Sequence, residues 1–416
     1  MKGLVKLTFL LFLTIGFVQA QNIANSPYSR FGLGELNTHY TSIYSAMGGV
    51  GVGVNNPLSI NVNNPASYAS FYRQRFVMQT GGVHTTNLMQ TSELKQVTNF
   101  TNISHFNIGF PVAKWWGSSI GLLPYSDVAY SFSDFDEQAN AELHFEGEGG
   151  LSRFYIGNAF EPTSFLSIGL NVNYLFGNLT TSRSVIFEDE VALNAKNSRE
   201  TLLSDFYYDF GLLLHGKIKD WNSSFGLTLN NGDVIDANRY ELTERFRINN
   251  SIELIEDTVG IPVSVQGEIK LPTSLGIGAS MYNENWFLAA DYQSQDWNEF
   301  LAFGESDSLA NSTKIAFGVE YIPNRKAINN YFQMVRYRLG AYTYNTHLQI
   351  KNQQLKENVV SFGFGLPMKR SGALLNLSAE FGQRGTTDFG LVKESFARFK
   401  VGLVLSDLWF IQRKYD

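Results

Sequence analysis

Alternation of apolar and polar residues is the strongest pattern in this sequence, and it is clearest near the C-terminal end. Phe399, Val401 and Leu403 occupy every second position of the segment 396–410, and mostly polar or small residues stand between them. A period of two over this length predicts a β-strand with one apolar face. Because the segment ends in an aromatic pair, Trp409–Phe410, it is typical of a transmembrane barrel strand whose apolar face meets lipid.

The same alternation recurs from residue 71 onward, and the connections between the alternating segments are short and long in turn. This rhythm predicts an all-β fold, a transmembrane antiparallel barrel of about fourteen strands with short periplasmic turns and longer outer loops. A soluble array of strands has no reason to keep it, and no repeat of fixed period indicates a propeller. We expect the main outer loops at residues 84–100, 133–149, 184–204 and 232–262, the last being the longest.

The N-terminal residues predict export. Lys2 and Lys6 precede the apolar run 7–18, and small residues surround a cleavage point after Ala20. We therefore expect residues 1–20 to be a cleaved secretory signal peptide. No later apolar run reaches the length of a transmembrane helix, so a membrane protein of this sequence must be a barrel. The expected location is the outer membrane of a Gram-negative cell, in contact with its lipid.

Residues 21–70 lack the strand pattern and are rich in Asn, Ser, Gly and Pro. The glycines at 48, 49, 51 and 53 permit close backbone approach. A periplasmic linker is one interpretation, but the Gly, Val and Ala content favours a plug folded into the lumen, because a free linker would carry more charge. We therefore expect a plug over residues 21–70 and the barrel over residues 71–416.

Composition argues against several functions. Cysteine is absent, which excludes disulfides and thiolate metal sites, and the net charge of −6 offers no basic surface for nucleic acid. The six histidines lack metal-ligand spacing, no GxSxG motif is present, and the glycines of 48–54 lack the Lys-Ser/Thr of a phosphate-binding loop. We expect no cofactor and no enzymatic activity, although a catalytic site at the barrel rim is the remaining enzyme alternative.

Several motifs occur in order along nearly the whole mature chain. They are SPYSRFGLGEL (26–36), AMGGVGVG (46–53), NPA (64–66), GLLPYS (121–126), LPTSLGIGAS (271–280), WFLAADYQSQDW (286–297), RLGAY (338–342), FGFGLP (362–367) and DLWFIQRKYD (407–416). Together they resemble the FadL/TodX-type outer-membrane transport family, specifically its Bacteroidota branch. The resemblance implies a fourteen-stranded barrel with an N-terminal plug, and passage of hydrophobic molecules through a gap in the wall.

Members of the broader group also serve as non-transporting partners in outer-membrane secretion and assembly machines. One departure from the family bears on this choice. Its fatty-acid transporters capture ligand at extended outer loops with helical insertions, whereas here only 232–262 is long, and it is acidic and polar. This weakens the case for a high-affinity capture site.

Pro124 and Tyr125 lie inside the third predicted strand. Proline cannot donate to a strand ladder, so Pro124 predicts an edge, a bulge or a break. In the family that this chain resembles, the third strand bends inward and opens a lateral hole. Residues 121–126 either shape such an exit or form a bulge near the membrane rim with no transport role, and both interpretations stay open.

Alternation places a set of charged residues on the lumen face. An arginine on the lipid face near the midplane would cost roughly 2–4 kcal/mol, so these side chains must face inward. The bases could orient a ligand carboxylate by charge-assisted hydrogen bonds. We favour the other interpretation, a paired network that holds the plug. The set comprises Arg336, Arg338, Arg398 and Lys400, with Asp291, Glu320 and Glu380.

Asn64, Pro65 and Ala66 form the third candidate site. They could act as a gate that shifts when ligand binds. We favour a rigid turn that joins the plug to the first strand, because Asn and Pro readily form turns.

Two functions remain. The first is passive uptake of a hydrophobic, fatty-acid-like molecule through the plugged lumen and a lateral opening. The second is a non-transporting accessory barrel that binds protein partners in a secretion or barrel-assembly complex. Short loops favour the accessory barrel and the proline favours the transporter, which we place first because it is the family's commoner role.

Overall fold

The computed structural model describes residues 26–37, 41–189, 192–249, 252–307, 309–327, 329–368 and 372–408. The predicted signal peptide and the ending 409–416 lie outside the described residues. The helical elements are η1 (Pro27–Arg30), α2 (Ser42–Ser45), η2 (Pro65–Ser70), η3 (Trp297–Glu299), η4 (Tyr331–Gln333) and η5 (Asp388–Gly390). None of these is long and apolar enough to cross a membrane.

Strands dominate the structure, and their bounds are as follows: β1 (Glu35–Leu36), β2 (Arg75–Gln90), β3 (Lys95–Ala113), β4 (Trp116–Asp136), β5 (Ala141–Thr163), β6 (Leu166–Phe187), β7 (Asn194–Ile218), β8 (Trp221–Asn231), β9 (Val234–Asn249), β10 (Ile252–Thr258), β11 (Val263–Lys270), β12 (Thr273–Tyr282), β13 (Trp286–Asp296), β14 (Leu301–Ala302), β15 (Ser312–Tyr321), β16 (Arg336–Ile350), β17 (Gln353–Pro367), β18 (Leu374–Arg384) and β19 (Lys393–Leu408).

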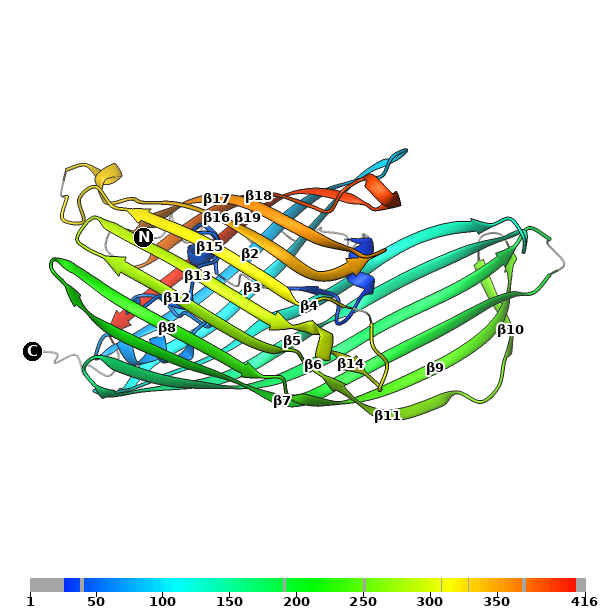
Figure 1. Ribbon diagram of the computed structural model, residues 1–416, viewed down its shortest axis with the longest axis horizontal. Coiled ribbons are helices and arrows are strands. Elements are labelled where there is room, and N and C mark those ends of the chain that lie inside the picture. The colour runs from blue at the N-terminus through cyan, green and yellow to red at the C-terminus, as the bar shows by residue number, and fades with distance from the viewer. Residues whose placement is uncertain are drawn as a thin grey trace, which may run out of the picture.

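Fourteen of these strands form a closed antiparallel barrel: β2 to β8, β12, β13 and β15 to β19 (Figure 1). Each pairs with the next in the series, and the pairing of β19 with β2 from Lys393–Gln90 to Leu408–Arg75 closes the ring. The predicted fold class is confirmed. The alternation of side chains explains it, because every strand presents one face to the lumen and one to the outside.

The outer wall is apolar where the barrel would meet lipid. Phe317, Phe381 and Val401 are 59%, 46% and 53% exposed, although each belongs to a well-paired strand. Strands β8, β12, β13 and β15 have 10 or 11 residues, which is the length of one tilted membrane crossing. The barrel therefore has the surface and the height of a transmembrane β-barrel.

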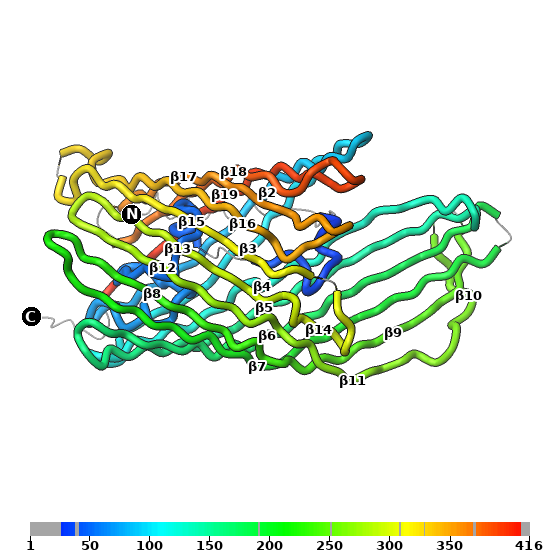
Figure 2. The backbone as a smooth tube through the Cα atoms, in the orientation of Figure 1, coloured from blue at the N-terminus to red at the C-terminus, as the bar shows by residue number. Residues whose placement is uncertain are grey.

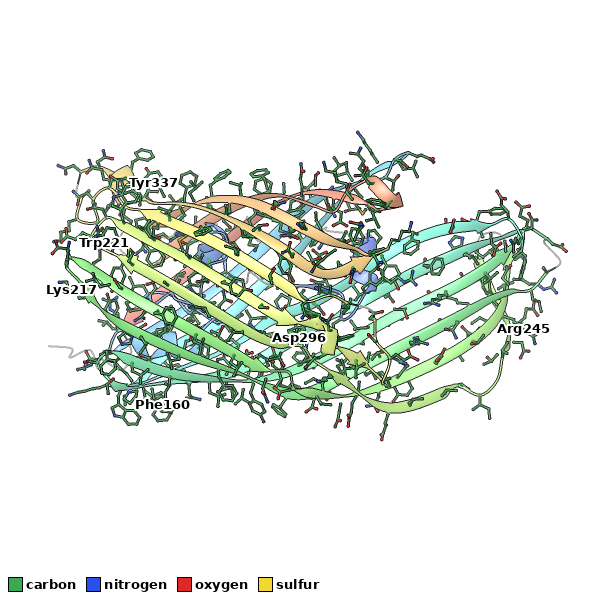
Figure 3. The ribbon with its side chains drawn as sticks, viewed as in Figure 1. Phe160, Lys217, Trp221, Arg245, Asp296 and Tyr337 are labelled. Atoms are coloured by element: carbon green, nitrogen blue, oxygen red, sulfur yellow. The ribbon has the colours of Figure 1, made fainter. Side chains whose placement is uncertain are left out.

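Aromatic side chains gather at the short-turn end, which we call the inner end. Trp286 and Tyr321 pack with their ring centroids 4.4 Å apart. Figure 3 shows Phe160, Trp221 and Tyr337 at this end, where Lys217 of β7 also lies. Such a girdle marks the membrane interface, because aromatic side chains with polar edges favour that depth.

At the other, outer end, four strands extend far beyond a single crossing. β4, β5, β6 and β7 have 21 to 25 residues, and they run on past the end of β8, β12 and β13 to the right in Figure 1. Their outer halves join β9, β10, β11 and β14 in a curved sheet, which we call the outer extension.

The predicted loops at 133–149, 184–204 and 232–262 were therefore largely wrong, because most of these residues are strands of the outer extension. Residues 84–100 are mainly strand as well, since β2 ends at Gln90 and β3 begins at Lys95. The reason is physical. Outside the membrane both faces of a strand can carry polar groups, so the apolar alternation that marks a barrel strand disappears there.

Residues 41–70 pack against the inner side of the barrel wall, where glycines leave room for their backbone (Figure 2). A Cβ on Gly117 would lie 1.9 Å from the Tyr68 carbonyl oxygen, and one on Gly226 equally close to that of Val52. On the other side, a Cβ on Gly340 would lie 2.1 Å from the Gly48 nitrogen. The N-terminal chain thus touches strands β4, β8 and β16 without intervening side chains.

Candidate functional site

The barrel wall is incomplete between β3 and β4 at their outer ends. The ladder between these strands ends at the pair Phe106–Leu122. Beyond it, β3 pairs only with β2, out to Lys95–Gln90, while β4 pairs with β5 out to Asp136–Ala141. Within the described residues, no ladder joins residues 95–105 to residues 123–136, and we call this interval the seam.

The seam begins at the predicted proline irregularity. Pro124 is opposite Ser152 and Ser126 is opposite Leu151, so Tyr125 is the extra residue of a β-bulge in β4. A bulge bends its strand and increases the local twist. The predicted strand irregularity is confirmed, whereas its role as an exit stays a prediction.

The N-terminal chain covers part of the seam. β1 pairs with β4 through Glu35–Asp127 and Leu36–Ser126, and the Asn37 N–H donates to the Tyr125 carbonyl at 2.9 Å. The Tyr125 ring packs edge-on against Tyr207, with centroids 6.1 Å apart. The bulge therefore contacts two elements, the N-terminal chain through its backbone and Tyr207 of β7 through the Tyr125 ring.

A cavity of about 100 Å³ lies behind the seam. Phe100 and Ile103 of β3 line it together with Pro124 of β4, and charged groups of Glu35 and Arg398 line its inner side. A second cavity of about 190 Å³ is lined by residues that include Tyr125, Arg153, Asp209 and Lys314. Both are smaller than a pocket for a drug-sized ligand.

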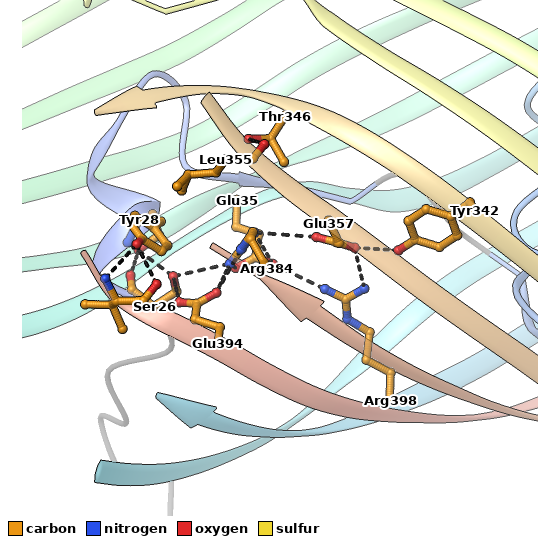
Figure 4. A network of polar contacts seen from close by, with 12 residues as sticks. Ser26, Tyr28, Glu35, Tyr342, Thr346, Leu355, Glu357, Arg384, Glu394 and Arg398 are labelled. Carbon is orange, nitrogen blue, oxygen red and sulfur yellow. Dashed lines mark hydrogen bonds and ion pairs between the residues drawn. The ribbon is translucent and has the colours of Figure 1, made fainter. Parts of the chain in front are cut away.

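An ion-pair network fixes the N-terminal chain to the wall beside the first cavity (Figure 4). Arg384, at the end of β18, lies 3.2 Å from Glu35 and also pairs with Glu394 of β19. The Ser26 hydroxyl donates to Glu394 at 2.5 Å. Burial alone would raise the pKa of the Glu35 carboxyl, but Arg384 and Arg398 hold it below its ordinary value.

Tyr28 anchors the same segment. Its hydroxyl donates to the Val392 carbonyl at 2.6 Å and accepts from the Val392 N–H at 2.9 Å. Burial raises the pKa of Tyr28 to about 12, so its hydroxyl stays protonated and able to donate across the physiological range.

Arg398 and Lys400 belong to this network. Arg398 lies 3.5 Å from both Glu35 and Glu357, and Glu357 accepts the Tyr342 hydroxyl at 2.5 Å. Lys400 donates to the Ser45 hydroxyl at 2.6 Å and lies 3.7 Å from Glu380. Both predicted bases face inward, and each contacts the N-terminal chain as well as a carboxylate of the wall. Whether these bases hold the N-terminal segment or orient a ligand stays a prediction.

Arg336 and Arg338 form a separate cluster at the start of β16. Arg338 donates to Glu320 and to the Asn376 side chain, both at 2.7 Å, and Arg336 lies 3.5 Å from Glu320. Arg338 and Glu320 are buried, at 4% and 7% exposure. The predicted lumen bases thus fall into two clusters, Arg398 with Lys400 and Arg336 with Arg338.

Asn64, Pro65 and Ala66 lie against β6 and β7. The Asn64 side chain caps η2 by accepting the Ala66 N–H at 3.0 Å, and it donates to the carbonyls of Val52 and Leu212 at 2.7 and 3.1 Å. Pro65 is the first residue of η2, where its missing N–H is not needed. The placement is that of a capped, buried turn, and a gating role stays a prediction.

Asp291 of β13 supplies another attachment. Its carboxylate accepts the backbone N–H groups of Gly51 and Val52 at 2.5 and 2.8 Å. Here the sequence correctly placed an inward carboxylate, and only the structure shows that it binds glycine-rich backbone.

Sequence reasoning missed Glu35, Glu357, Arg384 and Glu394 as site residues. Arg384 continues the period-two series that begins at Glu380, so extending the strand would have found it. The alternation predicts strands over 358–368 and 373–382, which leaves Glu357 and Arg384 in the neighbouring connections. Nothing in the alternation could have identified Glu35, because it lies in the segment without a strand pattern.

The outer mouth is filled by an apolar core. Tyr28 and Leu33 of the N-terminal chain pack with Leu348 of β16 and with Trp297 and Leu391 from connections between strands, all at most 5% exposed. This core lies beside the ion-pair network of Arg384 and Glu35.

Comparison with known proteins identifies the family of this chain. The model of the BamG family matches residues 2–416. The chain belongs to the BamG family. No curated protein matches it.

Solved structures similar to this BamG-family chain are FadL-type barrels. The Pseudomonas putida toluene transporter TodX has 15% identity and a TM-score of 0.60, with 90% of this chain and 99% of that chain covered. The Ralstonia pickettii toluene transporter TbuX has 12% identity and a TM-score of 0.60, with 88% of this chain and 98% of that chain covered. A Pseudomonas aeruginosa FadL homologue has 10% identity and a TM-score of 0.56, with 89% of this chain and 98% of that chain covered. At these identities the similarity establishes the FadL/TodX-type fold.

Proposed function

We propose that this protein is a passive, non-enzymatic outer-membrane channel for small hydrophobic molecules, with a side opening at the seam. The observation that carries the proposal is the end of the β3–β4 ladder at Phe106–Leu122, directly before the Pro124 bulge. Fold neighbours that are toluene transporters support this class of ligand. A fatty-acid-like ligand is the finer form of the proposal.

The apolar core around Tyr28 and Leu33 would obstruct entry from the outer mouth. A molecule entering from outside would have to displace the apolar core around Tyr28 and Leu33. The cavity behind the seam has a volume of about 100 Å³, so the space available before any movement suits only a very small molecule. Uptake would then depend on movement of the N-terminal chain away from β4.

Deletion of Tyr125 tests the seam. Removing the extra residue of the bulge leaves Pro124 and Ser126 opposite Ser152 and Leu151 in a regular register. We expect initial uptake of labelled toluene and of labelled palmitate to fall at least tenfold in cells with a lipopolysaccharide outer leaflet. Deletion of Asn140, in the exposed β4–β5 turn, is the control for an equal change in length. Unchanged uptake by the Tyr125 deletion would contradict the side opening.

A second candidate function is an accessory barrel that binds protein partners. The filled lumen favours it, since two apolar clusters and the Arg384 network occupy the space that a ligand would cross. The discriminating result is uptake equal to that of cells lacking the protein, together with stoichiometric partner proteins in purifications from the native membrane. A lone barrel with a bound hydrophobic molecule would contradict it.

A further inference from the structure

The outer extension ends in a long strand edge. β10 and β11 lie one after the other along the same side of β9, from Ile252–Asn249 to Lys270–Val234. On its far side, β11 meets β14 only at Ile269 and Lys270, and the Phe303 N–H donates to the Glu268 carbonyl. Among the described residues, no strand covers the far side of 252–266, which we call the outer edge.

The outer edge carries unused backbone groups. The Leu271 N–H donates to Asp233 of the β9 side, whereas the Glu268 carbonyl accepts from Phe303 on the opposite side. Because direction alternates along a strand, the N–H groups of Ser264 and Gln266 point away from β9. Both residues are exposed, so an additional strand could reach these groups.

Apolar side chains are concentrated along the same residues. Ile261 is 87% exposed, and Ile252 and Ile255 are each 63% exposed. These positions lie beyond the strands β8 and β12, which end where the outer extension begins, so lipid does not cover them (Figure 1). Such an apolar patch in water commonly marks an interaction site. The exposed apolar residues of the edge are Ile252, Leu254, Ile255, Val259, Ile261, Val263 and Val265.

The surroundings of the edge are acidic. Residues 233–268 contain eight Asp or Glu against three Arg, and residues 127–150 contain seven Asp or Glu with no Lys or Arg. Four of the eight carboxylates of 233–268 are paired with bases, Glu241 with Arg199, Glu253 with Lys196, Glu256 with Arg247 and Asp257 with Arg245, and an acidic excess remains across the two ranges. The excess of Asp and Glu in the outer extension is thus larger than the net charge of −6 for the whole chain. An approaching segment therefore meets a negative potential.

We propose that the outer edge docks an extended, basic segment of another exported protein, which adds to the sheet as a strand. The free N–H and C=O groups supply main-chain hydrogen bonds, the apolar side chains supply contact area, and the acidic surface selects Lys and Arg. The register shift at Ile255/Asp257 and Pro262 interrupt the edge, so the partner pairs along two short runs, 252–255 and 263–266. This inference holds whether or not a small molecule crosses the barrel.

The test uses the full-length protein in detergent and two fluorescent ten-residue peptides, one alternating Lys and Val, the other Glu and Val. We expect the basic peptide to bind at least tenfold more tightly than the acidic one. Gln266→Pro removes one outward N–H without touching the β9 ladder, and we expect it to weaken binding of the basic peptide at least tenfold. Gln266→Ala keeps the N–H and the charge, and should bind as the unchanged protein does.

Three results would overturn the proposal. One is equal binding of the two peptides, and another is equal binding by Gln266→Pro and Gln266→Ala, which would reduce the effect to charge alone. The third is self-association without peptide that Gln266→Pro abolishes, because the occupant would then be a second copy of this chain. An unchanged thermal unfolding midpoint of Gln266→Pro shows that the barrel is intact. Toluene uptake is measured separately, so failure of the docking site and failure of the channel are distinguishable.

Discussion

Glu35 and Arg384 lie 3.2 Å apart, although 349 positions separate them in the sequence. The pair joins β1, which covers the seam, to the outer end of β18. Arg384 is 8% exposed at its side chain and also pairs with the fully buried Glu394. One guanidinium therefore neutralises carboxylates from the N-terminal chain and from the barrel wall.

Arg384→Met should destabilise the protein strongly. The substitution leaves the carboxylate of Glu394 buried without its cation, and breaking a buried pair in this way costs about 3–5 kcal/mol. The thermal midpoint, followed by heat-dependent gel mobility, should fall. Arg245→Met is the control, because its pair with Asp257 is exposed and such pairs contribute about 0–1 kcal/mol. Equal effects of the two substitutions would contradict the assignment.

Acidification should release the N-terminal chain. The pKa of Glu35 is lower in the folded protein than in the unfolded chain, so its stabilising effect is complete above the unfolded value and is lost as pH falls through the folded value. A spin label at Arg30→Cys, an exposed position in a chain without cysteine, should become more mobile below the ordinary glutamate pKa. In Glu35→Gln the same label should be mobile already at pH 7, with a smaller change on acidification.

Asp291→Asn should loosen the glycine-rich segment. The carboxylate accepts the backbone N–H groups of Gly51, Val52 and Gly53, and hydrogen bonds to a charged group contribute about 1.5–3 kcal/mol each. Hydrogen exchange of residues 51–53 should accelerate accordingly, while exchange in the barrel strands stays slow. Asp220→Asn, in the exposed β7–β8 turn, should leave exchange unchanged. Equal protection in both variants would mean that packing alone holds the segment.

Gly226→Ala should displace the N-terminal chain from the wall. The added Cβ would lie 1.9 Å from the Val52 carbonyl oxygen, which is backbone and has no side chain to rotate away. We expect proteolysis within residues 41–70, in a barrel that still closes. Gly216→Ala adds the same group where nothing lies within 4 Å, and should resist protease as the unchanged protein does.

In the barrel strands, the alternating pattern was sufficient to predict which side chains face outward and which face the lumen. Residues such as Phe399 and Val401 face outward, while Arg398 and Lys400 face the lumen, as expected because a charge in lipid is expensive. The same rule correctly placed Asp291, Glu320 and Arg338 inside. Glu357 and Arg384 also follow it, since burial alternates through both positions, but the predicted strands of 358–368 and 373–382 stop short of them.

The sequence by itself determined the barrel, its approximate strand number, an irregularity of the strand at Pro124 and the inward direction of the lumen charges, since each follows from a period of two and from the missing N–H of proline. Only the tertiary structure decided which charges meet. Glu35 pairs with Arg384 and Arg398, and Asp291 binds the backbone of Gly51, because closure of the barrel surrounds the N-terminal chain with strands from the whole sequence. The outer extension likewise became visible only in the structure, since strands in water need no apolar face.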